Sequence, residues 1–242
     1  MNRTSIFYKP IFYAVVFAYT GLTYLTLRFN ELAPRLYRED GYFENLGALS
    51  LFIASGLMFY AFYSTIKRRR ITKVFWVKQA AYLALALLFL FGAGEEISWG
   101  QRIFGFATPE SLAEINKQDE ITIHNIEFNG VALPFESEFD VFWGFFVFLI
   151  PLVAAALPRF NKFGSKFIPI VPWGLGMFFV FNYLLAKVAK LVLEADYSYA
   201  GVPFVQAVQE IKESNYEFFY IFVCLFILLD LLRAERQLDL SQ

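Results

Sequence analysis

Two adjacent carboxylates, Glu95 and Glu96, stand in the segment GAGEEISWGQR, at the end of an apolar run that begins near Gln79. Two carboxyl groups in one site can share a proton, and the acid that keeps it can serve as a general acid. A charge deep in a bilayer costs about 2.5–3.5 kcal/mol, which Arg102, a metal ion, a shared proton or water would have to offset. An ion pair with Arg102 satisfies only one of the two acids. This imbalance favours a functional site.

Further polar groups follow the acid pair. If the helix continues through the segment, Glu95, Ser98 and Arg102 share one face at spacings of three and four residues, and Glu96 falls on the neighbouring stripe. The glycines of the segment let another helix or a ligand approach the backbone closely. We therefore predict that Glu95 and Glu96 are catalytic residues, together with His124 in the loop that follows.

The loop over residues 99–140 carries candidate metal ligands. Glu120 and His124 lie one turn apart if the segment is helical, and they also share a face if it is an extended strand. Glu96, Glu120 and His124 could hold one divalent cation. Carboxylates suit Mg²⁺, Mn²⁺ or Ca²⁺, while Zn²⁺ with one histidine is an alternative. A hydrogen-bonded structural role for His124 is the competing interpretation.

Other outer loops also place acids beside apolar runs. The segment REDGYFEN precedes the second run, and Glu210, Glu213 and Glu217 form one acidic face before the last. A solvated helix start explains Glu210, whereas Glu217 is closest to the apolar run. The residues predicted to line a polar pocket are Asp40, Glu44, Ser98, Gln101, Arg102, Asn116, Gln118, Asn125 and Glu217.

The composition predicts an integral membrane protein that positions these residues. Of 242 residues, 58% are hydrophobic and only 18% are charged, which is too apolar for an ordinary soluble domain. We predict a single all-α transmembrane domain over residues 1–242, a bundle of about six transmembrane helices. The expected spans are residues 11–27, 46–66, 79–98, 141–157, 170–193 and 218–232.

An interfacial helix is expected in the long outer loop. Thr108 is a suitable N-cap and Pro109 a suitable first helical residue, so we predict a helix over residues 109–117. Lys and Arg concentrate in the segment KRRRITKVFWVK and near both termini, which predicts cytoplasmic N- and C-termini. The acids then lie mainly on the outer face.

Several classes of protein are excluded or disfavoured. With one cysteine, Cys224, and one histidine, the chain has no disulfide framework and no site that needs two histidines. P-loop, dinucleotide-binding and nucleophile-elbow motifs are absent. The basic run lies beside a span and is typical of a topology anchor, so we expect no nucleic-acid partner. Membrane lipids, a lipid-linked substrate, and a membrane-protein partner or second copy are the expected partners.

The motifs GEEISWGQRIFGFATPE, Asn116–x–Gln118–x–Glu120 with His124–Asn125, and Glu39–Asp40–Gly41 with Glu44 resemble a family of bacterial multi-pass inner-membrane proteins that has no assigned activity. The resemblance covers most of the chain and implies a bacterial inner-membrane location. The segment DGYFEN is more weakly similar to membrane hydrolases of the alkaline ceramidase type. Those enzymes bind zinc with three histidines, and a single histidine argues against the same chemistry here.

Three classes of function are consistent with these patterns. The leading hypothesis is a metal- or carboxylate-dependent enzyme that acts on a lipid or lipid-linked substrate at an outward-facing acidic pocket. A proton- or cation-coupled transporter or channel is the second, since acids within a membrane also mark ion paths. The third is a non-catalytic subunit of a membrane complex. Whether the chain is an enzyme is open from the sequence.

Overall fold

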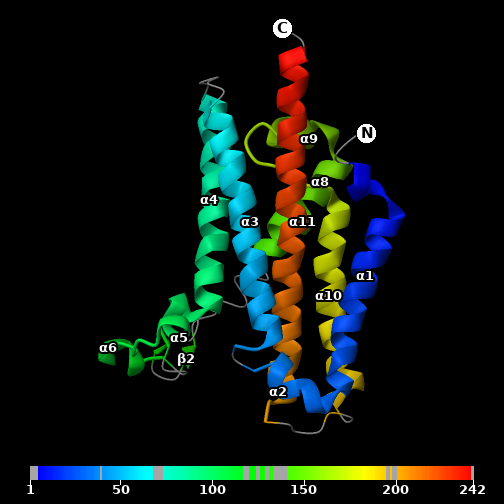
Figure 1. Cartoon of the computed structure of the whole chain (residues 1–242). Coiled ribbons are helices and arrows are strands. Elements are labelled where there is room, and N and C mark those ends of the chain that lie inside the picture. The colour runs from blue at the N-terminus through cyan, green and yellow to red at the C-terminus, as the bar shows by residue number, and fades with distance from the viewer. Residues whose placement is uncertain are drawn as a thin grey trace.

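The structure is a computed structural model of the chain. It describes residues 5–38, 40–67, 73–116, 120–123, 126–128, 131–132, 141–194, 197 and 201–240. Long helices run side by side, and a smaller segment that contains α5, α6 and β2 projects from one end of them (Figure 1).

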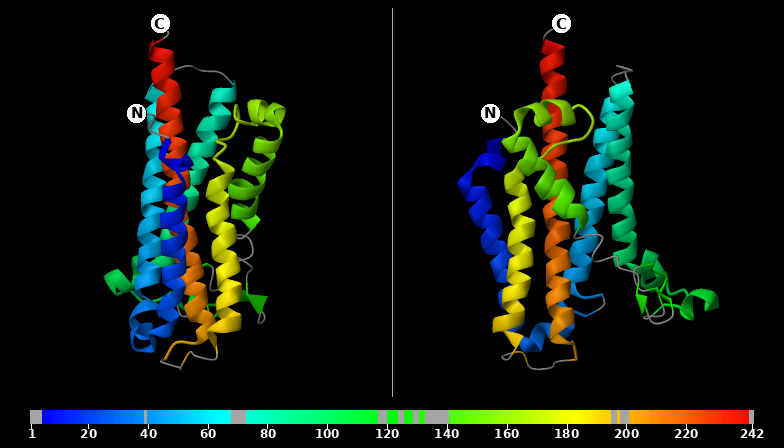
Figure 2. Two further views of the ribbon diagram at one scale, coloured as in Figure 1. Left: turned by 90° about the vertical axis from the view of Figure 1, so that its right-hand side faces the viewer. Right: turned by 180° about the vertical axis from the view of Figure 1, so that it is seen from behind.

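The long helices form one bundle. They are α1 (Pro10–Leu25), α3 (Tyr42–Lys67), α4 (Lys73–Glu96), α10 (Trp173–Val192) and α11 (Phe204–Leu240). A π-helical turn, η5 (Gly144–Leu149), continues directly into α8 (Ile150–Ala156). Helix α11 packs against α3 and α10, and α3 also packs against α4 (Figure 2). The beginning of α1 and the end of α11 lie at the same end of the bundle (Figure 1).

Short elements connect the long helices. They are η1 (Ser5–Tyr8), η2 (Thr26–Arg28), η3 (Asn30–Leu32), α2 (Ala33–Leu36), η4 (Ser98–Gly100), α5 (Gln101–Phe104), α6 (Glu110–Ala113), α9 (Pro158–Gly164) and a two-residue antiparallel ladder of β1 (Glu127–Phe128) with β2 (Val131–Ala132). The ladder, α5 and α6 belong to the projecting segment, so the long loop after α4 has a local structure of its own.

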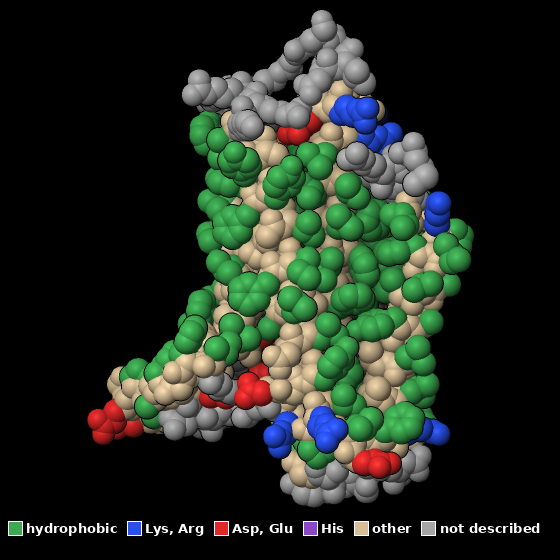
Figure 3. Space-filling view, viewed as in Figure 1, with side chains coloured by type: hydrophobic (Ala, Val, Ile, Leu, Met, Phe, Trp, Pro, Cys, Tyr) green, Lys and Arg blue, Asp and Glu red, His purple; other side chains and the backbone are tan. Residues whose placement is uncertain are grey.

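Four helices among the described residues are long and apolar enough to cross a membrane. They cover Pro10–Arg28, Tyr42–Ile66, Phe75–Glu96 and Trp173–Val192, and Val141–Ala156 is a shorter apolar helix. Apolar side chains cover the middle of the bundle surface, while charged ones gather towards its two ends (Figure 3). Helices satisfy their backbone hydrogen bonds internally, which a bilayer requires. The all-α membrane fold that composition predicts is thereby confirmed, and a total of six spans stays a prediction.

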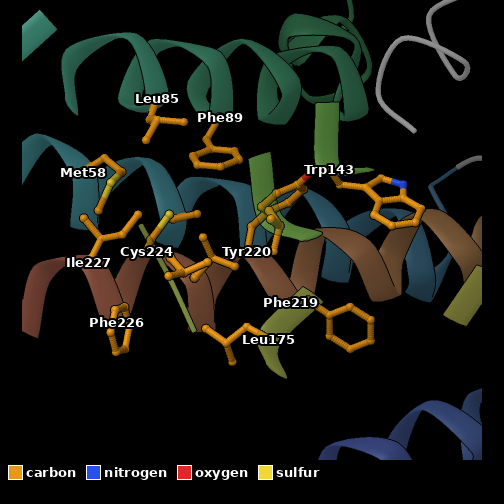
Figure 4. Close-up of a cluster of buried hydrophobic side chains, with 14 of the residues drawn as sticks. Met58, Leu85, Phe89, Trp143, Leu175, Phe219, Tyr220, Cys224, Phe226 and Ile227 are labelled. Carbon is orange, nitrogen blue, oxygen red and sulfur yellow. The ribbon is translucent and has the colours of Figure 1, made fainter. Parts of the chain in front are cut away.

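Aromatic and small apolar side chains fill the interior of the bundle. Phe89 of α4 packs against Tyr220 of α11, and Phe179 of α10 packs against the same tyrosine, with ring centroids 4.9 and 5.1 Å apart. Trp143 lies 5.7 Å from Phe179. Figure 4 shows this cluster, in which Met58, Leu85 and Cys224 also lie between the helices. The middle of the bundle is therefore an apolar core.

A buried polar network joins α1, α10 and α11 within this apolar surrounding. Asn182 Oδ1 accepts hydrogen bonds from Tyr24 Oη (2.9 Å) and Asn215 Nδ2 (3.0 Å), and Asn182 Nδ2 donates to the Lys212 carbonyl (2.8 Å). Asn215 Nδ2 also donates to Thr23 Oγ1 at 2.9 Å. Such interhelical hydrogen bonds fix the register of membrane helices. Asn182 therefore has the structural role that its position in an apolar helix suggests.

Replacing Asn182 with Leu is expected to destabilise the bundle. Three hydrogen bonds are lost, and bonds of this kind contribute about 0.6 kcal/mol on average and up to about 1.7 kcal/mol. We expect a loss of about 2 kcal/mol, which lowers the Tm by about 4–8 °C in a domain of this size. Thermal unfolding in detergent measures it, with Tyr183→Phe on the exposed side of α10 as the control. Equal Tm values would show that the network is not stabilising.

The loop between α4 and the ladder differs from the sequence prediction. The interfacial helix expected over residues 109–117 is only the single turn α6, and Pro109 rather than Thr108 occupies its N-cap position. Thr108 instead accepts a hydrogen bond from Gln101 Nε2 at 2.7 Å. Lys117 lies outside the described residues. A side-chain contact with α5 thus replaces the helix cap that local sequence favours.

Candidate functional site

Helix α4 does not continue through GEEISWGQR. It ends at Glu96, and Ser98, Trp99 and Gly100 follow with φ angles of 47°, 52° and 80°. Only glycine adopts this left-handed conformation without a steric cost, which is about 1–2 kcal/mol for other residues. Three consecutive left-handed residues thus form a turn between α4 and α5. The prediction that Glu95, Ser98 and Arg102 share one face of a continuous helix is therefore wrong.

Trp99 is held in this turn by the helix that precedes it. Its indole Nε1 donates to Glu95 Oε1 at 2.6 Å. The ring packs against Gly94, where a Cβ atom would lie 2.8 Å from two ring atoms. Strained backbone persists only where its surroundings fix it, and it occurs preferentially at functional sites. Glycine at position 94 thus leaves room for the indole that closes the turn.

The carboxylate of Glu95 also fixes the loop that follows α4. Glu95 Oε2 accepts the backbone N–H of Ile123 at 2.7 Å, so both oxygens have partners within the protein. Ser98 Oγ donates to Glu120 Oε2 at 3.0 Å, and Gln101 Oε1 accepts the N–H of Ile121 at 2.7 Å. These bonds tie the end of α4 to residues 120–123. We call this set of contacts the loop clamp.

Asn116 completes the loop clamp from the other side. Its Nδ2 donates to the Thr122 carbonyl at 2.8 Å, and its Oδ1 accepts the N–H of Glu120 at 3.3 Å. Asn116 also forms a β-bridge with Ile126. Glu95, Asn116 and Glu120 are all buried. Their hydrogen bonds hold the loop against the end of α4, and the clamp includes five of the residues that the sequence singles out: Glu95, Ser98, Gln101, Asn116 and Glu120.

Replacing Glu95 with Ala is expected to loosen the loop without unfolding the bundle. Each hydrogen bond to a charged group contributes about 1.5–3 kcal/mol, so losing the bond to Ile123 should raise amide exchange at that residue at least ten-fold. Hydrogen exchange read by mass spectrometry measures it, with Glu110→Ala, an exposed acid in α6, as the control. Unchanged exchange at Ile123 would show that the carboxylate does not hold the loop.

Glu96 faces the bundle instead of the loop. Its carboxyl group forms a side-chain hydrogen bond with Glu217 of α11. A hydrogen bond between two carboxyl groups requires a proton on one of them. The carboxyl groups that face each other are therefore those of Glu96 and Glu217, rather than those of Glu95 and Glu96. Adjacent residues of a helix point about 100° apart, which is why one acid faces the loop and the other faces α11.

Three further acids surround this pair. Glu44 of α3 and Glu210 and Glu213 of α11 lie close enough to Glu96 to interact with it electrostatically. We call Glu44, Glu96, Glu210, Glu213 and Glu217 the acid cluster. They come from the first turn of α3, the last turn of α4 and one face of α11, at the end of the bundle from which the segment with α5 and α6 projects (Figures 1 and 3). Acidic side chains are visible in the recess between that loop and the bundle (Figure 3).

Glu217 is the most enclosed acid of the cluster. Its side chain is 4% exposed, and its Oε2 atom is buried without a hydrogen-bond partner. The same oxygen lies against Gly47 of α3, where a Cβ atom would be only 1.7 Å away. Ser214, one turn earlier on the same face of α11, is 2% exposed, and its Oγ is also without a hydrogen-bond partner. Unsatisfied buried polar groups are uncommon in folded proteins and suit a site that binds something.

The two acids at the start of α3 differ in position. Asp40 is exposed, has a φ of 60°, and its N–H donates to the Glu44 carboxylate. Asn45 Nδ2 donates to the carbonyls of Asp40 and Gly41, at 2.9 Å each. These bonds cap the first turn of α3 and place Glu44 beside the pair. The backbone of Asp40 therefore shapes the helix start, and a pocket-lining role of its side chain stays a prediction.

The structure describes only part of the predicted metal site. Among the described residues, no group of three or more His, Cys, Asp or Glu side chains is placed to hold a metal ion. Of the predicted ligands, Glu96 bonds Glu217 and Glu120 bonds Ser98, so the two carboxylates face different partners. His124, Gln118, Asn125 and the side chain of Arg102 lie outside the described residues. The metal site stays a prediction.

Sequence reasoning missed Gly47 and Ser214, and it did not place Glu210 or Glu213 in the site. Gly47 follows Glu44 and Asn45 at the start of an apolar run, and only the packing of α11 against α3 reveals its contact with Glu217. Ser214 is one residue of a polar stretch that precedes the last apolar run, and its spacing from Glu210 and Glu217 was its only signal.

Comparison of the chain with family models, curated proteins and solved structures finds no match. The site must therefore be interpreted from its own geometry. That geometry has two parts: a loop clamp whose carboxylates are engaged in hydrogen bonds, and an acid cluster where α3, α4 and α11 meet.

Proposed function

We propose that the chain is a six-span protein of the bacterial inner membrane, with cytoplasmic termini, and that the acid cluster is the catalytic site of an enzyme acting on a lipid or lipid-linked substrate. The observation that carries the proposal is the hydrogen-bonded pair of Glu96 and Glu217, at the end of the bundle from which the segment with α5 and α6 projects. One carboxyl of the pair holds a proton and can donate it, while the other is ionised and can accept one. Of the metal-dependent and carboxylate-dependent enzymes that the sequence suggests, this pair supports the carboxylate-dependent one.

The positions of polar and apolar residues favour a one-sided site. The acid cluster lies at one end, while the middle of the bundle is filled by aromatic rings and by residues such as Met58 and Cys224 (Figure 4). A channel needs polar or hydrated groups along its length. An enzyme needs only access from one side and from the surrounding lipid. The half-buried position of Glu96, beside the more enclosed Glu217, gives such access.

The loop clamp supports the same interpretation. It fixes the end of α4 through the buried carboxylate of Glu95, one residue before Glu96. Catalytic groups must be held within a few tenths of an ångström of their productive positions, and buried hydrogen bonds on a neighbouring residue provide that rigidity. Glu95, predicted to be catalytic, then acts as a positioning residue. We also propose that the chain belongs to the inner-membrane family that has the EDG-x-x-E and GEEISWGQR motifs.

Proton-coupled transport is the second candidate, and the shared proton of Glu96 and Glu217 is the observation that favours it. A reconstitution experiment separates the two. Purified protein is incorporated into liposomes made from a polar lipid extract that includes lipid-linked phosphates, with a pH-sensitive dye inside. Product formation is followed by mass spectrometry, with and without added Mg²⁺, Mn²⁺, Ca²⁺ or Zn²⁺, and proton flux by fluorescence.

We expect a lipid product that is lost in Glu96→Gln and Glu217→Gln and retained in Glu110→Gln. Flux without a product, lost in the same two variants, would overturn the enzyme in favour of transport. Neither product nor flux, together with a stoichiometric membrane-protein partner that co-purifies, would identify a non-catalytic subunit. Product formation that survives both substitutions would show that another site performs the chemistry.

A further inference from the structure

Two neighbouring cavities lie at the end of the bundle opposite the acid cluster. The larger, of about 560 Å³, is lined by residues of η1, α1, α8, α9, α10 and α11, including Tyr8, Phe17, Ala155 and Met177. The smaller, of about 280 Å³, includes Lys78, Ser165 and Asp230. Ligand cavities range from about 300 to 1,000 Å³, so the larger one could hold part of a small molecule or lipid.

The two cavities form one amphipathic site. They share the lining residues Asn161, Ile170 and Phe226, so they adjoin each other beneath α9. Aromatic and small apolar side chains line the larger cavity, whereas the smaller one contains lysine, aspartate and serine side chains. An apolar cavity next to a polar one matches a molecule with a hydrocarbon chain and a polar head.

The lining residues place this site at the edge of the bilayer. Trp173 is the first residue of α10, a helix that is long and apolar enough to cross a membrane. Trp173 and Tyr8 are 46% and 65% exposed, so the larger cavity reaches the protein surface. Trp and Tyr concentrate where headgroups meet acyl chains. The cavity therefore opens at the depth where a phospholipid changes from headgroup to acyl chain.

The chain around α9 carries only positive charges. Residues 141–193 contain no Asp or Glu, and Arg159, Lys162 and Lys166 lie within or just after α9, all three exposed. Arg159 and Lys162 are three residues apart and so lie on neighbouring positions of the helix surface. Asp230 in the smaller cavity interacts electrostatically with Lys78. Arg159 and Lys162 flank Asn161, the α9 residue that lines both cavities, so α9 brings two cations next to the site.

We propose that these cavities bind an anionic phospholipid, with an acyl chain in the larger cavity and the phosphate headgroup beside Arg159 and Lys162 of α9. The site lies at the end of the bundle opposite the acid cluster and does not depend on the proposed enzyme activity. Each basic residue near a membrane surface strengthens the binding of anionic lipid about five-fold, which corresponds to about 1 kcal/mol. The two α9 cations together would give a preference of more than ten-fold.

Trp173 provides a direct probe of occupancy. A variant that retains only this tryptophan, with Trp76, Trp99 and Trp143 changed to Phe, is reconstituted with brominated phosphatidylglycerol or brominated phosphatidylcholine. Bromine on an acyl chain quenches a tryptophan that it contacts. We expect half-maximal quenching of Trp173 at a lipid fraction at least ten-fold lower for phosphatidylglycerol.

Substitutions separate the contribution of the α9 cations from that of the larger cavity. Arg159→Gln and Lys162→Gln should each reduce the preference about five-fold, whereas Lys187→Gln and Lys190→Gln, at the other end of α10, should not change it. Ala155→Phe, which fills the larger cavity, should weaken quenching by both lipids. Equal quenching by the two lipids, or α9 variants with unchanged preference, would overturn the proposal. If cross-linking two copies of the chain into a dimer shielded Trp173 from quenching by both lipids, the cavity would be assigned to a second copy of the chain, and the lipid proposal would be overturned.

A second measurement avoids the tryptophan substitutions, since Trp143 packs in the core. Native mass spectrometry of the otherwise unmodified protein counts the phosphatidylglycerol molecules that survive removal of detergent. One retained molecule, lost in the combined Arg159→Gln and Lys162→Gln variant, supports the site. The absence of a retained lipid, or retention that the combined variant shares with the wild type, contradicts it.

Discussion

Replacing Glu217 with Gln is expected to abolish turnover while making the protein more stable. Glutamine has nearly the same shape as glutamate, and its Nε2 can donate a hydrogen bond to the Glu96 carboxylate. The amide carries no proton that can be transferred at neutral pH, so the pair loses its acid–base capacity. General acid–base catalysis contributes about 10²–10⁴-fold, and we expect a loss of at least 100-fold in the turnover detected in liposomes.

The gain in stability follows from the surroundings of Glu217. Its side chain is 4% exposed, one of its oxygens has no hydrogen-bond partner, and Glu96, Glu210 and Glu213 act on it electrostatically. A neutral amide cannot ionise, so the repulsion and the cost of burying a second charge no longer arise when the pair loses its shared proton. Each kcal/mol gained raises the Tm by about 2–4 °C for a domain of this size. Opposite changes in stability and activity are typical of residues kept for function.

The matched control for this experiment is Glu110→Gln, an exposed acid of α6 for which neither turnover nor Tm should change. A double-mutant cycle with Glu96→Gln tests whether the two carboxyls act as one unit. If they do, the two substitutions together should cost little more activity than either alone. A Tm that falls in Glu217→Gln would show that the carboxyl is a structural member of the bundle, and additive losses of activity would show that the pair does not act together.

Much of the fold could be predicted from sequence because hydrophobicity alone determines where helices can lie in a membrane. The apolar run at residues 46–66 lies within α3, and the run at residues 79–98 overlaps α4, which ends at Glu96. The end of α4 could not be predicted. Ser98 and Trp99 adopt left-handed conformations without a sequence signal, and only Gly100 marks the turn.

The sequence identifies the two acids of the central pair as candidates but does not predict that they pair with each other. Glu96 and Glu217 were both candidates, yet they are 121 positions apart in the chain and meet only because α11 packs between other helices. Nothing in one sequence states which helices are neighbours. Glu95 and Glu120 are glutamates as well, yet their carboxylates accept hydrogen bonds within the loop clamp. Residue type and spacing cannot separate these two roles, because the partners decide them.

Replacing Gly47 with Ala should disable the site through a single methyl group. A Cβ atom at this position would lie 1.7 Å from Glu217 Oε2 and 2.8 Å from its Cδ, so the carboxyl must move away from α3. A displacement of about 1 Å in a catalytic group can lower the rate about 100-fold, and we expect a loss of at least ten-fold in turnover. Mass spectrometry of the lipid product measures this loss.

Gly56→Ala is the matched control, because Gly56 lies on the same helix with no atom within 4 Å of a Cβ built there. Both substitutions favour α3 by up to about 1 kcal/mol, since alanine is a better helix former than glycine. Gly56→Ala should therefore retain full turnover and equal or higher stability. Glu217→Asp, which shortens the acid by one methylene, should restore part of the turnover in the Gly47→Ala background, because the shorter side chain leaves room for the methyl group. Full turnover in Gly47→Ala alone would show that the carboxyl of Glu217 does not act from its position against α3, and the acid cluster would then lose its most enclosed member.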